Sequence, residues 1–404
     1  MSVKLSQLGK IPYLFAIVLL LYMEYIFMNN TVQEDLSSTM LLQVLFVFIS
    51  VILIFANVLA KPQQRIDVTI FLAGLLCILM IFTTVAIESS SSYNVFFAIS
   101  KNMIWCLAFF IGYISSQKFK KDGSIAKMVL VLLVFLIILF FQQIENDYSV
   151  TNMDYVLTSI YYILCCVPFV FLIKNSKVKI ILLFIIGLLV LFSFKRSALL
   201  VSLIVAMVLI VKAPKNLFKN RRAVIFIFLI SVGFIILLFT NQSLYQSIME
   251  IWGGRFESGN TDRLKIYQDV IHLLEDSNIF DLLFGHGYDA TIADSRYNLS
   301  AHNEFLEILY NYGIFALIVF IAFIILLIKK SKILRENCNI NLYNGYLCAV
   351  TIFIVASFPS HMLTYGTYFS LLSLYMGFAV GRANKTLEEG LEYEDRNINI
   401  SQGV

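Results

Sequence analysis

The sequence predicts an all-α integral membrane protein with about twelve transmembrane helices and one large outer loop. Of its 404 residues, 59% are hydrophobic and only 14% are charged, whereas a soluble domain carries about 25% charged residues. Apolar stretches long enough to cross a hydrocarbon layer about 30 Å thick recur along the chain. This composition excludes a water-soluble enzyme. The counts of 18 glycines, 5 prolines and 6 cysteines also exclude collagen-like, disordered and disulfide-rich scaffolds.

The predicted spans divide the chain into four parts. They lie near 11–28, 40–60, 67–87, 95–114, 125–142, 155–173, 178–194, 198–211, 223–240, 309–328, 342–361 and 364–381. Spans one to nine therefore occupy 1–240, the outer loop 241–308, spans ten to twelve 309–382, and a polar tail 383–404. The first span is too long for a cleavable signal peptide, so we expect it to stay as an anchor. We expect the acidic tail to be disordered.

The placement of lysine and arginine sets the orientation, because short cytoplasmic loops carry an excess of these residues. Most of the 30 basic residues fall in cytoplasmic segments when both termini are placed inside. The basic residues left on the outer side are Lys101, Lys195, Arg196, Arg255, Arg263, Lys265 and Arg296. All but Lys101 lie in 195–196 and 255–296, so these two segments need a reason beyond topology.

The outer loop has the composition of a folded segment. Apolar residues at helical spacing predict short amphipathic helices at 244–252 and 262–275. A turn is expected at Gly285-His286-Gly287, where glycines permit positive φ. A further helix should start near His302 and run into the tenth span, with a break at Gly313. Long ordered loops tend to carry function, although a structural cap without chemistry remains the alternative.

Two outer arginines are candidates for binding an anion. Arg196 lies in a tight hairpin between the seventh and eighth spans, where its planar guanidinium suits a lipid-linked phosphate. Arg263 opens the helix at 262–275, and helix N-termini favour anions. The alternatives are a snorkelling anchor for the Lys195–Arg196 pair and, for Arg263, a solvated face paired with Asp262 or Asp269.

Histidines are the candidates for proton transfer. His302 stands beside a helix start at the membrane surface, where it suits a general base, although a capping role is the alternative. His286 lies between two glycines and is expected in an exposed turn, whereas His361 ends the eleventh span and faces the same outer side. No histidine pair at i,i+4 and no Cys-x-x-Cys occurs, so we expect no metal and no cofactor.

These motifs together resemble the superfamily of O-antigen polymerases (Wzy-type) and O-antigen ligases (WaaL-type). The family pattern has an outer arginine beside a serine, a second arginine heading a loop helix, a glycine turn, and a His-Asn pair opening a helix with a later Gly-Ile step. Here the matching segments are Lys195-Arg196-Ser197, Arg263-Leu264-Lys265-Ile266-Tyr267, Leu283-Phe284-Gly285-His286-Gly287, His302-Asn303-Glu304-Phe305-Leu306 and Tyr312-Gly313-Ile314. Family members often have tryptophan in place of Tyr267 and an aliphatic residue in place of His286.

The resemblance implies a membrane-embedded glycosyltransferase of the GT-C-like type in the bacterial inner membrane. It would polymerise oligosaccharide repeat units carried on undecaprenyl diphosphate into O-antigen or capsule, with inversion and without a metal. Its catalytic residues would be His302, Arg263 and Arg196. Candidate substrate-binding residues are Lys195, Arg255, Tyr267, His286, Asn303, Glu304, Arg296 and His361. Expected partners are the lipid-linked donor and acceptor, membrane lipid, a chain-length regulator and a flippase, with no nucleic acid.

Two alternatives stay open at this point. A ligase would pass the lipid-linked glycan to the lipid A core, and the motifs separate it poorly from a polymerase. A polysaccharide flippase or other transporter would suit twelve spans with both termini inside. Transporters usually show paired repeats, and the outer loop at 241–308 has no counterpart in the first half of the chain.

Overall fold

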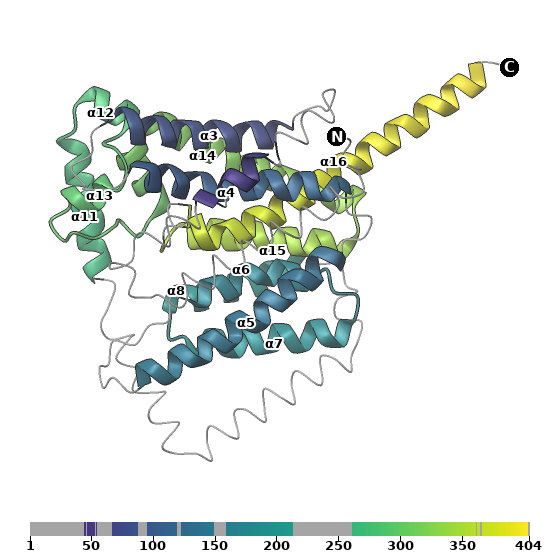
Figure 1. The fold of residues 1–404 in the computed structure, drawn as a ribbon, viewed down its shortest axis with the longest axis horizontal. Helices are drawn as coiled ribbons and strands as arrows, with labels where there is room; N and C mark the ends of the chain where they lie inside the picture. Colours follow the sequence, from purple (N-terminus) through teal and green to yellow (C-terminus); the bar gives the residue numbers. More distant parts are fainter. Residues whose placement is uncertain are drawn as a thin grey trace, which may run out of the picture.

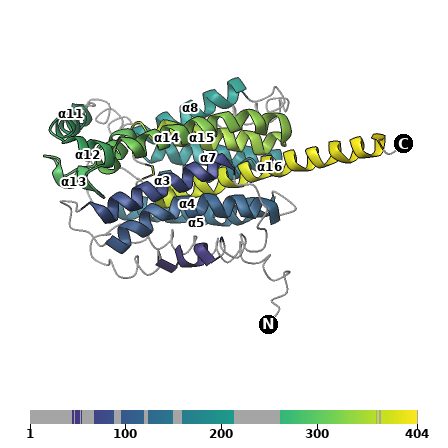
Figure 2. The ribbon, with the colours of Figure 1, turned by 90° about the horizontal axis from the view of Figure 1, so that it is seen from above.

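The computed structural model describes residues 44–45, 47–52, 54, 67–87, 95–118, 123–148, 159–212, 261–360, 362–363 and 366–402. Within these ranges every regular element is a helix, which confirms the predicted all-α class. The elements are α3 (Val68–Ala86), α4 (Val95–Lys118), α5 (Gly123–Tyr148), α6 (Ile160–Val170), α7 (Ser176–Phe192), α8 (Arg196–Lys212), α11 (Thr261–Glu275), α12 (Ile279–Phe284), α13 (Ala290–Asp294), α14 (Glu304–Asn337), α15 (Ile340–Ala356) and α16 (Gly366–Gln402). The long helices lie alongside one another, and α11, α12 and α13 gather at one end (Figures 1 and 2).

Several of the predicted spans correspond to helices. In the described part of the chain, three helices are long and apolar enough to cross a membrane, namely α3, Val95–Ser116 of α4, and α14. Shorter apolar helices lie at Val129–Gln142, Ile160–Val170 and Ile340–Ala356. The predicted spans near 11–28 and 223–240 and the predicted loop helix at 244–252 lie outside the described residues. The total of twelve spans therefore stays a prediction.

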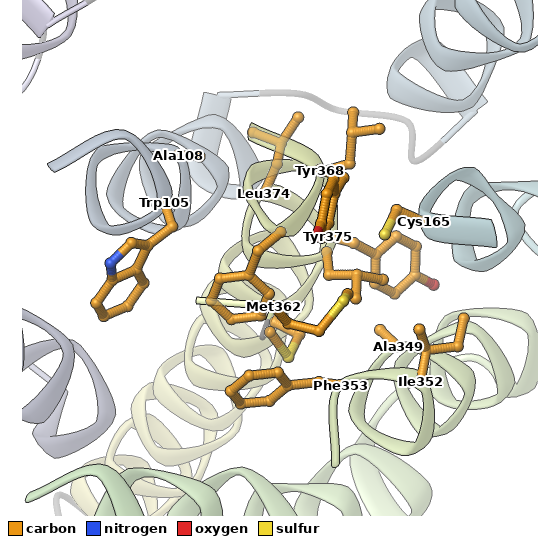
Figure 3. Packing of buried hydrophobic residues seen from close by; sticks show 14 of the residues in the cluster. Trp105, Ala108, Cys165, Ala349, Ile352, Phe353, Met362, Tyr368, Leu374 and Tyr375 are labelled. Atoms are coloured by element: carbon orange, nitrogen blue, oxygen red, sulfur yellow. The ribbon is translucent and has the colours of Figure 1, made fainter. Parts of the chain in front are cut away.

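The core is built from aromatic and small residues of α4, α6, α15 and α16. Trp105 of α4 is fully buried, with ring centroids 6.1 Å from Phe323 and 5.8 Å from Phe369. Phe353 stacks on Phe369 at 4.4 Å. Figure 3 shows Trp105, Phe353 and residues of the neighbouring helices converging on this centre. Because protein interiors pack as densely as organic crystals, this core holds the helix ends in fixed relative positions.

Helices α4 and α16 pack with their backbones in close approach. A Cβ on Gly112 of α4 would overlap the carbonyl oxygen of Leu374, and one on Gly377 of α16 would overlap the carbonyl oxygen of Phe109. Glycine is therefore required at both positions. Small residues allow such close packing of membrane helices.

The end of the bundle that carries α11–α13 is organised by two glycine positions. Gly285 (φ 87°) and Gly313 (φ 80°) lie where two backbone segments pass against each other. The backbone N–H groups of His286 and Gly287 donate to the carbonyls of Tyr310 and Asn311, both at 3.0 Å. Gly313 also kinks α14 between its first turns and its long apolar part. The predicted turn at 285–287 and the predicted break at Gly313 are both confirmed. The turn is not exposed as expected, because Gly285 and Gly287 are buried and the side chain of His286 is 17% exposed.

Two sequence-based expectations need correction or completion. The tail was expected to be disordered, but α16 continues to Gln402 and projects beyond the bundle (Figure 1). Residues 383–402 lack proline and contain four glutamates, which favour helix, so polarity alone was a poor guide. The short helices α12 and α13 were not predicted, because five or six residues are too few to show a helical period.

Candidate active site

His302 lies in a strained bend immediately before α14. Its backbone has φ 50°, in the left-handed region that residues with a side chain rarely adopt. Asn303 then caps α14, because its side-chain oxygen accepts hydrogen bonds from the N–H groups of Phe305 (3.0 Å) and Leu306 (3.2 Å). The His-Asn pair thus combines a bend with a helix start.

Helix α11 brings Arg263 to this bend. Arg263, Tyr267 and Val270 follow one another at i, i+4 and i+7, so they share one face of the helix. Val270 belongs to a buried cluster with Ala301, and the hydroxyl of Tyr267 lies 3.4 Å from the carbonyl oxygens of both His302 and Phe358. The face of α11 that packs on the bend therefore carries Arg263 to the neighbourhood of His302.

The turn between α7 and α8 supplies a second cation. Phe194 has φ 50° and is buried, and the N–H of Lys195 donates to the hydroxyl of Ser193 at 3.3 Å, which makes the reversal tight. The ammonium of Lys195 lies 6.0 Å from the centre of the Tyr161 ring. The hydroxyl of Tyr161 in turn donates to Ser197 at 2.7 Å.

The charges at this end act on His302. Burial, the guanidinium of Arg263 and the ammonium of Lys195 lower the pKa of His302 from 6.5 to about 4. The imidazole is therefore neutral at pH 7 and able to accept a proton. The second cation that acts on His302 is Lys195, the neighbour of Arg196 at the start of α8.

Three predicted substrate-binding residues have their polar atoms engaged within the protein. Glu304 is fully buried and accepts a hydrogen bond from the N–H of Leu363 at 2.8 Å. His286 stacks on Tyr310 with 4.1 Å between ring centroids, and its ring nitrogens lie 3.0 Å from the hydroxyl of Ser277 and 3.1 Å from the carbonyl oxygen of Tyr310. The oxygen of Asn303 is used in capping α14.

Arg296 pairs with Asp269, and its side chain is 80% exposed. Its Nε lies 3.3 Å from a carboxylate oxygen of Asp269, and its backbone N–H donates to the other oxygen at 2.8 Å. Asp269 stands on a different face of α11 from Arg263 and Tyr267, because two residues correspond to about 200° around a helix. The structure thus brings together His302, Arg263, Lys195 and Tyr267, while Arg255 and His361 lie outside the described residues.

Sequence reasoning missed Tyr161 as a member of this group. Its ring is fully buried, its hydroxyl contacts Ser197 and interacts with Ser360, and the charge of Arg263 reaches it. It was overlooked because it lies inside a predicted span. The available signal was a pair of adjacent tyrosines, 161 and 162, near the outer end of an otherwise apolar segment.

Comparison with known proteins finds one matching protein family. Residues 181–321 match the family model described as O-antigen ligase (Wzy_C). The matched segment contains Lys195, Arg263 and His302, the groups that the structure brings together.

This match supports membership of the superfamily of O-antigen polymerases and ligases. Members of the O-antigen ligase family are glycosyltransferase-like enzymes that act on lipid-linked oligosaccharides. The family and the apolar helices together make this a membrane-embedded protein. A search of the curated proteins found no match.

Proposed function

We propose that this O-antigen superfamily member polymerises undecaprenyl-diphosphate-linked oligosaccharide repeat units on the outer face of the bacterial inner membrane. The transfer is inverting and metal-independent, and it extends a surface polysaccharide. The observation that carries this proposal is the convergence of Arg263 and Lys195 on a neutral, half-buried His302. Such a site pairs cations for a diphosphate leaving group with a base for the acceptor hydroxyl.

The residues have distinct roles in the transfer. The acceptor hydroxyl attacks the anomeric carbon of the donor while the bond from that carbon to the diphosphate oxygen breaks, and the electron pair leaves with the diphosphate. Arg263, Lys195 and Arg196 offset the charge that develops there. His302 takes the proton of the hydroxyl, a contribution of about 10²–10⁴ in rate.

Donor binding strengthens the base in this scheme. The cations that lower the pKa of His302 are the ones assigned to the diphosphate. When the diphosphate is bound, its negative charge offsets theirs, so the pKa of His302 rises toward its ordinary value. A base close to neutrality is the more effective acceptor at pH 7, so His302 becomes most effective once the donor is in place.

The proposal is tested by surface glycan gels from a deletion strain. The strain carries the intact gene, no gene, His302→Ala, Arg263→Ala or Arg196→Ala. Arg296→Ala serves as the control because the side chain of Arg296 is 80% exposed and pairs with Asp269. We expect a ladder with the intact gene and the control, and a single repeat unit with the other three variants at equal membrane abundance. Normal ladders from all three would refute the mechanism.

The ligase is the second candidate, favoured by the description of the matching family model. A ligase shares the donor and the roles of the residues but uses a sugar of the lipid A core as acceptor. The same gels separate the two functions. If the deletion strain accumulates full-length polymer on undecaprenyl diphosphate that never reaches its final acceptor, the protein is a ligase.

A further inference from the structure

Behind the bend lies a buried carboxylate that no step of the proposed transfer uses. Glu307 of α14 is 3% exposed, and its carboxylate contacts three polar groups. One oxygen accepts the backbone N–H of Ala301 at 2.6 Å. The other accepts the side-chain amide of Asn311 at 3.0 Å and lies 2.9 Å from the hydroxyl of Thr291, which shares its single hydrogen with the side-chain oxygen of Asn311.

The hydrogen bond to Glu307 fixes the backbone of Ala301, the residue directly before His302. A residue with a side chain keeps a left-handed backbone only where its surroundings impose that conformation. Downstream of His302, the Asn303 cap and the bond from the N–H of Glu304 to the carbonyl of Ser357 at 2.9 Å fix the chain. Upstream, Glu307 fixes it through Ala301.

We propose that Glu307 is a positioning residue for His302. By holding the amide of Ala301 while α13 and Asn311 hold Glu307 itself, it keeps the bend in the conformation that places the imidazole beside Arg263 and Lys195. The inference rests on the proposed function, because it concerns the geometry of the same base. Glu307 touches no substrate in this scheme and acts only through the backbone.

The alternative is that Glu307 only stabilises the fold. The two roles differ in what a substitution changes. Misplacing a base slows the chemical step without weakening donor binding, so kcat falls and KM stays constant. Loss of fold stability lowers the amount of active protein and leaves both constants of the remaining molecules unchanged.

The test compares two substitutions of similar size at one position. Glu307→Gln keeps an acceptor oxygen for Ala301, whereas Glu307→Met has none. The purified full chain is reconstituted in vesicles with lipid-linked repeat units isolated from the deletion strain. We expect Glu307→Met to lower kcat about a hundredfold at unchanged KM. Glu307→Gln should stay within about fivefold of wild type, the equivalent of one neutral hydrogen bond.

A control removes a different bond of the same carboxylate. Thr291→Val breaks one contact of Glu307 but leaves the bond to Ala301 intact. Its kcat should also stay within about fivefold of wild type. Should Glu307→Met fail to fold, Glu307→Asp replaces it. Asp keeps the charge but withdraws the oxygen from Ala301, so we expect a fall in kcat at unchanged KM there too.

The outcomes separate this inference from the function on which it rests. If the wild-type protein forms no polymer in the vesicles, both the proposed function and the positioning role of Glu307 are overturned. If the wild type is active and Glu307→Met has the same kcat, with or without a raised KM, the positioning role alone is overturned. A fall in kcat as large for Thr291→Val as for Glu307→Met overturns it as well, because the bond to Ala301 would then not be decisive.

Discussion

At the scale of single residues, the site depends on how burial and charge change the basicity of one imidazole. His302 is removed from water and stands near two cations, and all three influences disfavour its protonated form. The same cations suit a diphosphate. In the proposed mechanism, one arrangement serves both leaving-group stabilisation and proton acceptance, and donor binding connects the two.

This connection predicts two different pH profiles. Protonated His302 cannot accept a proton, so activity is lost as the pH falls through its pKa. The profile of kcat/KM reports the free enzyme and should lose activity only near pH 4, because the pKa there is about 4. The profile of kcat reports the donor complex, where the diphosphate offsets the cations, so its acid limb should lie at higher pH. Initial polymerisation rates in vesicles measure both.

A variant supplies the control for these profiles. Arg263→Gln removes one of the causes that lower the pKa of His302, so the acid limb of the kcat/KM profile of its residual activity should move to higher pH. A limb that stays in place would show that Arg263 does not act on the base. Coincident limbs for kcat and kcat/KM in wild type would show that the donor does not act on it.

At the scale of elements, the turn before α13 and the kink in α14 form one unit. Gly285 and Gly313 have positive φ, and a Cβ on either would overlap backbone atoms of the other segment. Phe284 of α12 lies 6.5 Å from Phe82 of α3 and 5.5 Å from Phe315 of α14 between ring centroids. Phe284 thus joins the turn at 285–287 to α3 and to α14, the helix that begins directly after the bend at 301–303.

Gly313→Ala should destabilise the protein by about 1–3 kcal/mol, because it adds both a disfavoured φ and an overlap with the carbonyl of Leu283. The measurement is the thermal unfolding midpoint in detergent. Gly187→Ala in α7 is the matched control, since a Cβ there meets nothing within 4 Å. We expect that control to be neutral or stabilising by about 0.5–1 kcal/mol. Equal midpoints for the two variants would contradict this account.

At the scale of the whole molecule, a group of polar residues joins α3, α14 and α16 at the end away from the site. We call this group, Asp67, Lys330 and Asn384, the polar clamp. Asp67 caps α3 through the N–H of Thr69 at 2.8 Å, pairs with Lys330 of α14 and accepts from Asn384 of α16 at 2.7 Å. Thr83, near the other end of α3, donates to the carbonyl of Phe284 at 3.0 Å. Helix α3 is thus fixed at both ends, by the clamp and by the loop that carries the site.

Breaking the clamp should affect stability and leave the chemistry intact. Asp67→Asn keeps a cap but leaves Lys330 without its carboxylate, which costs about 1–3 kcal/mol for this part-buried pair. Adding Lys330→Met removes the uncompensated charge and should restore much of the loss. Unfolding midpoints in detergent measure both variants, and kcat of the folded fraction should match wild type. A double variant no more stable than Asp67→Asn would argue against the pair.

The clamp also has a pH dependence with a definite sign. Burial raises the pKa of Asp67, but the hydrogen bonds from Lys330, Thr69 and Asn384 outweigh burial and bring it below its usual value. The stabilisation from a carboxylate with a lowered pKa is present above the usual pKa of aspartate. It is lost as the pH falls through the lowered value.

The chain by itself determined the helical class, several helix ends and the glycine turn. Apolar length predicts a membrane helix because lipid leaves backbone groups no other partners, and Asn303 predicts a helix start because its side chain satisfies free N–H groups. The order of cations and histidine along the chain resembles that of the O-antigen polymerases and ligases, and the diphosphate-linked substrate and the base that this resemblance implies stay predictions. These signals are local, so they can be read without knowing how the helices pack.

Only the tertiary structure decided which of these residues meet. Lys195, Arg263 and His302 lie on three separate elements, and their proximity depends on how α8, α11 and α14 pack. Sequence reasoning grouped Arg296 with them, but packing turns it to Asp269 on another face of α11. Sequence spacing sets the face of a helix on which a side chain lies, whereas the partner of that face is set by long-range packing.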